Sequence, residues 1–463
     1  MQAQASERGK RRIGGFGSGG LPPGVKTLLL FLALGLLGVF FALSDPEASL
    51  RHLKAGFLSG NVKGNYFAIV DQIAVGAARR KGRISNLPSA GSVENVRRLV
   101  GAQNGCSAHF ALAQEGVAWP EGHRLELIGR LPRPESLVLL GRNADRISST
   151  RDMRRMRIGI GPEGSGTEFL MRQLLAPLAA LELEVSSGPI DEQLHKLERG
   201  ELDLGAMVID QDAVQLQEAV RDRKLQILDL PRAEAVAHTL PFLRVGRIEA
   251  GHYDVVAALP ASDKRVLQVD TLIVGNGCAS RSATQGLITL LGDIHPAFLR
   301  YNRENPNLTG LPYAPAAHAY YESGGPDWVG VYAPWVIDIM PTASWVQLAL
   351  GISVLLNLMG AANRFRLWRL DVARVNLELE IFMLLPETTT GDIARARPDP
   401  ALRPEEVGTG VQRIIDKLEA LYERCRKQSL SVLVPMGGEM AYRYQEALIM
   451  ERVRALRDLH HRL

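Results

Sequence analysis

The sequence contains few cysteines and no spaced ligand pairs of the kind that bind metals. Its three cysteines, Cys106, Cys278 and Cys425, form no C-x-x-C pair and have no metal-ligand spacing to histidine. No metal site is therefore predicted, and the cysteines are expected to be small buried apolar residues. A disulfide between Cys106 and Cys278 would need an oxidising compartment and adjacent side chains, and the sequence leaves that pairing open.

Signals for catalysis and for nucleic-acid binding are also missing. The chain has no H-E-x-x-H motif, and glycines flank Ser165 one residue away on each side, unlike the G-x-S-x-G elbow of hydrolases. The net charge of +4 is small and is concentrated beside two long hydrophobic segments. We therefore expect neither an enzyme nor a cofactor, and no nucleic-acid partner.

The first hydrophobic segment, residues 27–44 (TLLLFLALGLLGVFFALS), is uncharged. As a helix it would reach roughly 27 Å, close to the thickness of a bilayer core. Basic residues precede it and Asp45 and Glu47 follow it, so the positive-inside rule places the basic N-terminus, residues 1–26, in the cytoplasm. The alternative is a cleaved signal peptide, for which Ala42 and Ser44 would serve as the small residues of the cleavage site.

The second hydrophobic segment, residues 342–360, lies within a stretch that is uncharged from residue 339 to 363. Arg364, Arg366 and Arg369 follow with Trp368, a basic and aromatic flank typical of the cytoplasmic side. Both flanks predict the same two-pass topology in the lipid bilayer, with both termini cytoplasmic. A buried helix of a soluble core is the alternative for this segment.

Residues 157–170 (RIGIGPEGSGTEFL) have the pattern of a strand, a glycine-rich loop and the start of a helix. With no Cβ, Gly164 and Gly166 let backbone N–H groups approach a ligand, while Ser165 and Thr167 can cap the helix. The pattern indicates an anion-binding loop for a carboxylate or a phosphate. Nucleotide-binding motifs fit less well. Pro162 interrupts the dinucleotide fingerprint, and no lysine follows Gly166 as a Walker A loop requires. A purely structural glycine turn stays open.

The region between the two hydrophobic segments alternates strands, polar loops and helices. A strand at residues 53–58 leads through a loop into a helix at 66–80, and the pattern recurs in a second unit that begins near residue 157. That unit includes a charged helix at 191–199 and a buried strand after Gly200. Open α/β sheets bind ligands at the carboxyl ends of their strands, so two lobes with a cleft between them are expected.

Four separated segments occur in the order typical of one protein family. They are SAGSVENVRRL from Ser89, GIGPEGSGT from Gly159, HTLPFLRVGRIEAGHYD from His238 and HAYYESGG from His318. Together they resemble the TAXI family of solute-binding proteins, the periplasmic subunits of tripartite TRAP-type transporters. The resemblance covers roughly residues 50–330, and the second hydrophobic segment and the tail are similar to a membrane-anchored branch of that family.

The resemblance implies an α/β, two-lobe type II periplasmic-binding fold, flanked by two transmembrane helices and a helical C-terminal tail. The chain would cross between the lobes twice, near residues 138–143 and 271–275. The expected domains are the transmembrane helix 27–44, the binding domain 45–335 (lobe one about 46–140 plus 271–330, lobe two about 141–270), the transmembrane helix 342–360 and the cytoplasmic tail 361–463.

Ligand and partners follow from the same resemblance. Family ligands are small carboxylates such as glutamate or 2-oxoglutarate, and the family's membrane partners are TRAP-type permease subunits. Carried over by position, the implied ligand contacts are Gly64, Asn65, Tyr66, Gly91, Ser92, Gln114, Gly164, Ser165, Gly166 and Thr167. For each of them a structural role is the alternative, such as a core residue for Tyr66 and a strand-end cap for Gln114.

Two positions depart from the family pattern. The family shows a Gly-Gly-Thr-Tyr-like first loop, whereas this chain has Lys63 before Gly64, Asn65 and Tyr66, and His109 stands where an Asp is expected. Both residues could alter the choice of ligand. We expect the simpler roles, a solvated loop cation for Lys63 and a half-buried strand residue for His109.

The tail leaves two functions open. The expected function is membrane-anchored binding of a small carboxylate in the periplasm, at the bacterial inner membrane, for a TRAP-type transporter. An ordinary solute-binding subunit needs no cytoplasmic tail, so a membrane ligand sensor or scaffold with the tail as its output is the alternative. Helical spacing at residues 411–427 and 440–459, after a Pro-rich charged linker, predicts a helical pair there.

Overall fold

The computed structural model describes residues 23–386, 403–431, 434 and 438–462. Residues 1–22 of the predicted basic N-terminus and most of the predicted Pro-rich linker lie outside the described residues. By its internal contacts the chain divides into two compact units, Leu43–Thr342 and a unit formed by Met1–Ala42 and Ala343–Leu463.

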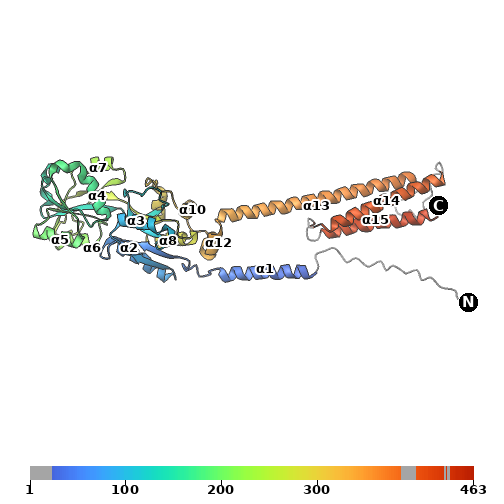
Figure 1. The fold of residues 1–463 in the computed structure, drawn as a ribbon, viewed down its shortest axis with the longest axis horizontal. Helices are drawn as coiled ribbons and strands as arrows, with labels where there is room; N and C mark the ends of the chain where they lie inside the picture. Colours follow the sequence, from blue (N-terminus) through green and yellow to red (C-terminus); the bar gives the residue numbers. More distant parts are fainter. Residues whose placement is uncertain (1–22, 387–402, 432–433, 435–437, 463) are drawn as a thin grey trace. The chain divides into compact units, whose positions relative to one another are not determined.

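The first lobe of Leu43–Thr342 is built on a five-stranded sheet in the order β2-β1-β3-β12-β4. β1 is parallel to β2 and β3, whereas β12 is antiparallel to β3 and β4. β12 comes from much later in the chain, and Figure 1 shows the blue and gold parts of this lobe lying together. The strands are β1 (Lys54–Leu58), β2 (Arg83–Leu87), β3 (Phe110–Gln114), β4 (Glu126–Arg130) and β12 (Thr271–Gly275).

The second lobe repeats the strand order of the first. Its seven-stranded sheet has the order β10-β11-β5-β8-β6-β7, with β9 paired to β5. The run β7-β6-β8-β5-β11 matches β2-β1-β3-β12-β4 pair by pair, two parallel pairs followed by two antiparallel ones. The strands are β5 (Glu135–Gly141), β6 (Arg157–Gly159), β7 (Glu184–Ser186), β8 (Leu204–Ile209), β9 (Gln226–Ile227), β10 (Leu243–Ile248) and β11 (Lys264–Val269).

The chain passes between the lobes twice, as the type II periplasmic-binding fold requires. β4 ends at Arg130 in the first sheet and β5 begins at Glu135 in the second, so the first crossing occupies residues 131–134. It lies earlier than the expected 138–143, because β5 is buried along its whole length and its apolar sequence does not indicate which sheet it joins. The second crossing is Asp270, between β11 and β12.

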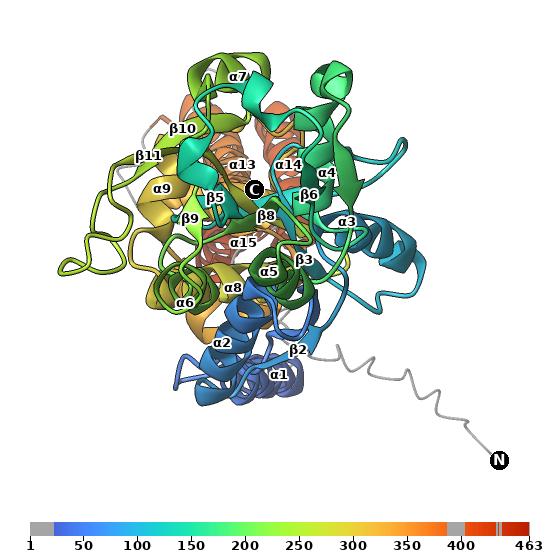
Figure 2. The same ribbon diagram turned by 90° about the vertical axis from the view of Figure 1, so that its left-hand side faces the viewer.

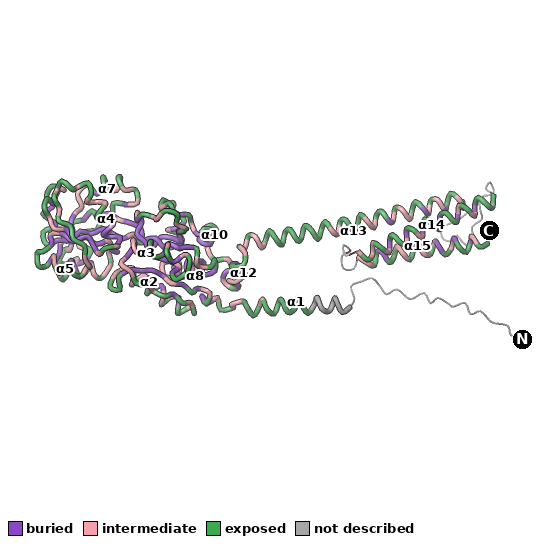
Figure 3. Tube along the Cα trace, viewed as in Figure 1, coloured by how far each residue is buried: buried purple, intermediate pink, exposed green. Residues whose placement is uncertain are grey.

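Helices cover both faces of each sheet. In β5, Leu137 and Leu139 pack in the same core as α4 and α7, while Val138 and Leu140 pack with α5 and α6, as strand alternation requires (Figure 2). Figure 3 shows the buried residues concentrated in the sheets. First-lobe helices are α2 (Asn65–Arg79), α3 (Ser92–Gly101), α8 (Arg281–Ile294), α9 (Phe298–Glu304), α10 (Pro315–Ser323), α11 (Trp328–Tyr332) and α12 (Pro334–Ile339); second-lobe helices are α4 (Gly166–Leu175), α5 (Ile190–Arg199), α6 (Val214–Arg221) and α7 (Ala233–Thr239).

The long helix α13 (Thr342–Leu384) has two parts with different surroundings. In the first, large apolar side chains such as Leu350 and Leu356 are exposed, each by 60% of its surface. In the second, buried positions recur at Asn363, Leu370, Leu377 and Ile381, a spacing of sevens and a four that is typical of helix packing. Among the described residues, α13 is the one helix long and apolar enough to cross a membrane.

The tail helices α14 (Pro404–Ser429) and α15 (Glu439–His460) pack with the second part of α13 around one core. The core joins Leu370 and Leu377 of α13 to Leu418 of α14 and Ile449 of α15. Tyr442 is buried in this core, and its hydroxyl donates to Asn363 Oδ1 at 2.8 Å. The predicted helical pair is therefore present, with α13 as a third member.

The first hydrophobic segment forms the helix α1 (Pro23–Leu43). Its described side chains include Phe31, Leu36 and Phe41, each exposed by more than 60% of its surface. Within the described part, Leu34–Leu43 is an apolar stretch too short to count as a span. The two-pass topology therefore stays a prediction.

Candidate functional site

A small cavity lies between the two lobes, in the loops that follow the carboxyl ends of several strands. Its volume is about 100 Å³, below the range of roughly 300–1,000 Å³ that holds drug-sized ligands, so it suits a compact small molecule. A second cavity of about 390 Å³ adjoins it, shares Asn65 and Pro162, and reaches Lys63 and Asp191.

Nine of the ten predicted ligand contacts line the smaller cavity. They come from four separate loops, so the fold brings together residues that are far apart in the sequence. That they bind a ligand stays a prediction. The nine are Gly64, Asn65, Tyr66, Gly91, Ser92, Gln114, Ser165, Gly166 and Thr167.

Four helices begin at this cavity. α2, α3, α4 and α5 have their N-caps at Gly64, Gly91, Ser165 and Pro189. First-turn N–H groups have no partner inside a helix, and within the described residues none is found for those of Gly166, Thr167 and Ser92. Unpaired N–H groups and the positive ends of helices favour an anion in the space between them.

Two glycines let α3 and α4 approach each other across the cleft. A Cβ on Gly166 would lie 2.5 Å from Gln114 Oε1 and 2.9 Å from Ser92 Oγ. A Cβ on Gly91, whose φ is +133°, would lie 3.1 Å from the Cα of Ser165. Neither position has room for a side chain while the lobes are together. Close approach of the two helices therefore requires glycine at both positions.

Gly164 does not line the cavity but joins the lobes. Its carbonyl accepts hydrogen bonds from the N–H groups of Val93 at 3.2 Å and Glu94 at 3.3 Å. The start of α3 is therefore capped by the glycine-rich loop of the other lobe.

Each of these two helices carries its own acid in the first turn. Glu94 Oε2 accepts from the N–H of Ala90 at 2.8 Å, and Glu168 Oε2 accepts from the N–H of Gly164 at 2.7 Å. Both carboxylates also pair with an arginine four residues later, Arg98 in the first lobe and Arg172 in the second. Part of the positive field at each helix start is thus neutralised within the protein.

The predicted hydroxyl ligands are acceptors in the fold. Ser165 Oγ accepts from the N–H of Glu168 at 3.1 Å, and Thr167 Oγ1 accepts from the N–H of Val208 at 3.2 Å. A hydroxyl that accepts keeps its own hydrogen for donation. Both side chains can therefore serve the fold and a ligand together, which makes them poor targets for a clean binding test.

The side-chain amide of Gln114 is a hydrogen-bond donor that is not paired within the described residues. Gln114 is 2% exposed, and its Nε2 is buried with no hydrogen-bond partner among the described residues. A buried unpaired amide costs free energy unless something pairs with it. Since Gln114 lines the cavity, a bound acceptor would supply the missing partner.

Glu135 also lines this cavity, although the sequence analysis did not predict it as a ligand contact. It is 4% exposed and accepts hydrogen bonds from Asn65 Nδ2 at 3.1 Å, from Thr271 Oγ1 at 2.8 Å and from Tyr66. Burial raises the pKa of Glu135 to about 7 despite these donors, and burial also raises the pKa of Tyr66. The signal in the sequence is a glutamate at the start of a strand that is apolar from Leu137 to Leu140.

Lys63 and His109, the two residues that depart from the expected family pattern, both make contacts within the fold. Lys63, whose side chain is 81% exposed, forms an ion pair with Asp191 of the other lobe at 3.3 Å. His109 is half-buried, and its Nδ1 accepts from the N–H of Gly56 at 3.1 Å. Burial lowers the pKa of His109, so the neutral ring that can accept is favoured.

A buried ion cluster surrounds the second crossing. Arg130 lies 3.6 Å from Glu115 and 3.9 Å from Asp270, all three with side chains at most 9% exposed. Arg244 of the second lobe pairs with Asp270, and the Tyr301 hydroxyl donates to Asp270 at 2.9 Å. Charges of both lobes thus meet at Asp270, the residue that joins their sheets.

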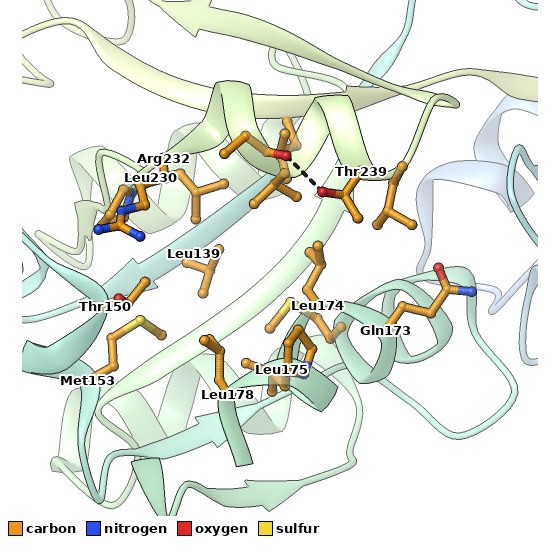
Figure 4. Close-up of a pocket in the computed structure, with 17 residues that line it drawn as sticks. Leu139, Thr150, Met153, Gln173, Leu174, Leu175, Leu178, Leu230, Arg232 and Thr239 are labelled. Atoms are coloured by element: carbon orange, nitrogen blue, oxygen red, sulfur yellow. Dashed lines mark hydrogen bonds between the residues drawn. The ribbon is translucent and has the colours of Figure 1, made fainter. Parts of the chain in front are cut away.

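Another cavity, of about 330 Å³, lies inside the second lobe and away from the cleft. Leu174, Leu175 and Leu178 face Leu139 and Leu230 across it (Figure 4). Its walls are mostly apolar, and it contains none of the predicted contacts. Among the described residues, no group of three or more His, Cys, Asp or Glu side chains could hold a metal ion.

The cysteines separate into a bonded pair and a buried thiol. Cys106 and Cys278 form a disulfide with a Cα–Cα distance of 5.5 Å, and Cys425 lies free in the core of the tail. The question that the sequence left open is thereby answered, and the expectation of small buried residues holds for Cys425 alone. Disulfides persist in oxidising compartments.

Residues 57–261 match the NMT1-like family, a range that includes parts of both lobes and the first crossing. No curated protein matches the chain.

Solved structures with similarity to the chain include solute-binding proteins. An ancestral arginine-binding protein bound to arginine is 11% identical, with a TM-score of 0.34 over 52% of this chain and 93% of its own. The aliphatic sulphonate binding protein SsuA from Escherichia coli is 14% identical, with a TM-score of 0.33 over 59% of this chain and 83% of its own. Scores this low do not establish a common fold, so the fold assignment rests on the strand order and the two crossings.

Proposed function

We propose that the protein binds a small carboxylate, such as glutamate or 2-oxoglutarate, in the cleft between its lobes and performs no catalysis. The observation that carries this proposal is the set of unpaired donors at the cavity: the N–H groups of Gly166, Thr167 and Ser92 and the amide of Gln114. They come from both lobes, so a bound anion would hold the lobes together.

The charges around the cavity favour one small anion over a larger polyanion. Glu94, Glu168 and Glu135 already occupy part of the donor set, and they would repel a triphosphate or a dinucleotide. A carboxylate needs only the few N–H groups that remain. An amine on the same ligand would find Glu135 as its partner, which favours an amino acid among the carboxylates.

Membrane anchoring and a role in transport complete the proposal. The exposed apolar part of α13 supports a span, and the disulfide between Cys106 and Cys278 supports a periplasmic place for the lobes. In this proposal TRAP-type permease subunits receive the ligand. One observation favours the sensor alternative: the tail forms a separate core with α13. If deletion of the protein abolished uptake of the ligand, that result would support the transport role over the sensor role.

The test is ligand-dependent melting of the full chain in detergent, with a panel of amino acids, 2-oxo acids and dicarboxylates. A true ligand raises the melting temperature by mass action. Gln114→Met keeps the shape and removes the donor, so affinity should fall about 10- to 100-fold, the value of a hydrogen bond to a charged group.

Gln173→Met is the matched control, because Gln173 lines the apolar cavity of the second lobe and not the cleft. It should bind the ligand as the parent does. A panel that moves no melting temperature, or equal losses in the two variants, would refute the proposed site.

A further inference from the structure

A cavity of about 460 Å³ lies in the tail unit, between α13 and α14. Arg366 and Arg369 of α13 and Arg424 of α14 line it, together with Gln428, and none of its nine described lining residues is acidic. Three cations from two helices therefore surround one space.

Within the described residues, the three arginines differ in their contacts from other arginines of the bundle. Among the described residues, none of them forms an ion pair or a hydrogen bond, whereas Arg374 and Arg457 of the same bundle each pair with an acid. Gln428 Oε1, at the same cavity, is buried and also has no hydrogen-bond partner within the described part of the chain. Unpaired cations beside an unused buried amide indicate a ligand with a negative charge and a hydrogen-bond donor.

The position along α13 identifies the surroundings. The part of the helix from Thr342 to residue 363 is uncharged and would reach roughly 33 Å, about one hydrocarbon thickness. The cavity begins at Ala362, directly after it. Phe365 and Trp368, 56% and 59% exposed, lie beside it with ring centroids 5.6 Å apart, as aromatic residues do at the headgroup level.

We propose that this cavity binds the headgroup of an anionic phospholipid, whose phosphate pairs with Arg366, Arg369 and Arg424. Arginine suits a phosphate diester because its planar donors meet two oxygens together. A headgroup hydroxyl would donate to Gln428 Oε1, which favours a glycerol headgroup such as that of phosphatidylglycerol. The inference rests on the membrane span of α13 proposed above, but not on the cleft or its ligand.

The test is lipid retention by the full chain in neutral detergent, counted by native mass spectrometry with equal amounts of phosphatidylglycerol and phosphatidylcholine. We expect one retained lipid and a preference of at least tenfold for phosphatidylglycerol. The pair Arg366→Gln and Arg424→Gln should lower retention about 25-fold, fivefold for each basic residue near an anionic lipid.

The control pair is Arg413→Gln and Arg454→Gln, two exposed arginines of α14 and α15 that do not line the cavity. It removes the same charge and should retain the lipid. Arg366→Lys with Arg424→Lys keeps the charge and should retain more lipid than the glutamine pair, provided that circular dichroism reports the parent's helix content.

Three outcomes would overturn the proposal: no preference between the lipids, equal losses in the two glutamine pairs, or displacement of the lipid by millimolar inorganic phosphate, which would indicate a site for free phosphate.

The membrane span of α13 is tested by a separate measurement. Cysteine introduced at Arg413 should react with permeant thiol reagents only; Cys425 cannot report, because it is buried and burial raises its pKa to about 12. Labelling from outside refutes the topology even where lipid retention is normal.

Discussion

The two lobes have the same strand order, but they cap their helices in different ways. In the second lobe, α4 is capped from within, because Ser165 Oγ accepts from the N–H of Glu168. In the first lobe, α3 has no side-chain cap, and the carbonyl of Gly164 from the second lobe accepts from its first turn. α2 is similar, since Asn65 at its start donates to Glu135 of the second lobe.

Because of this difference, the helix starts of the first lobe depend on contacts across the cleft more than those of the second lobe do. If the lobes separated, the cap of α4 by Ser165 would stay, because both groups belong to the second lobe, whereas the hydrogen bonds from the first turn of α3 to the carbonyl of Gly164 would be lost. The N–H groups of Val93 and Glu94 would then be free in an open protein. A ligand anion that enters the cleft can replace the carbonyl of Gly164, so opening itself creates donors for binding.

The largest expected effect concerns Glu135, the second-lobe acid that holds α2. Its pKa of about 7 lies above the usual value of 4.5, so the folded state binds more protons than the unfolded state between these pH values. The free energy of unfolding should therefore be highest below pH 4.5 and fall by about 3 kcal/mol as the pH rises through 7.

Glu135→Gln removes this titration. Melting temperatures measured from pH 4.5 to 8 should fall less in the variant than in the parent, by several degrees. Glu121→Gln, at an exposed position of the first lobe, is the control and should follow the parent. If the Glu135 variant has the parent's pH profile, the carboxyl does not titrate in this range and its role in holding α2 would need revision.

The helix starts that build the cleft could be predicted from the sequence, and their partners could not. Gly91, Gly166 and the hydroxyls beside them follow from local rules on glycine loops and caps. Glu135 lies at the end of a crossing, and its burial depends on Thr271 and Asn65, more than 60 residues away on either side. No local pattern contains that information.

The same limit explains the first crossing and the disulfide. β5 is apolar from Leu137 to Leu140, so its sequence predicts a buried strand but not which sheet it joins. Cys106 and Cys278 are separated by 172 residues and meet because β3 and β12 are neighbours. Ser165 caps α4 as its sequence pattern predicts, because its Oγ accepts from the N–H of Glu168. The pattern also predicts Thr167 as a cap, but Thr167 Oγ1 accepts from the N–H of Val208 on β8, a contact that appears only with the folded chain.

A smaller effect is expected at the contact between α3 and α4. Gly166→Ala places a methyl group against Gln114 Oε1 and Ser92 Oγ, so the lobes must move apart by a few tenths of an ångström or more. Overpacking of this kind costs about 1–3 kcal/mol, which corresponds to a roughly 5- to 150-fold loss of ligand affinity if the closed state alone bears it.

Titration calorimetry with the ligand found by melting would measure this loss. Gly101→Ala, at the last position of α3 with nothing within 4 Å of its new Cβ, is the control and should bind as the parent does. Unchanged affinity in Gly166→Ala would mean that α3 and α4 need not meet when the ligand is bound.

The smallest expected effect is at the mouth of the cleft, where Lys63 pairs with Asp191 across the lobes. Both side chains are more than half exposed, and exposed pairs of this kind contribute about 0–1 kcal/mol. Lys63→Gln should therefore weaken ligand binding less than about fivefold at low salt and not measurably at high salt, where screening removes the pair. Asp191→Asn should match it, because the two variants break the same contact. A Lys63 variant that loses more than tenfold while Asp191→Asn is unchanged would give Lys63 a different role: its ammonium would then reach the bound anion, and the departure from the family's first loop would set the choice of ligand.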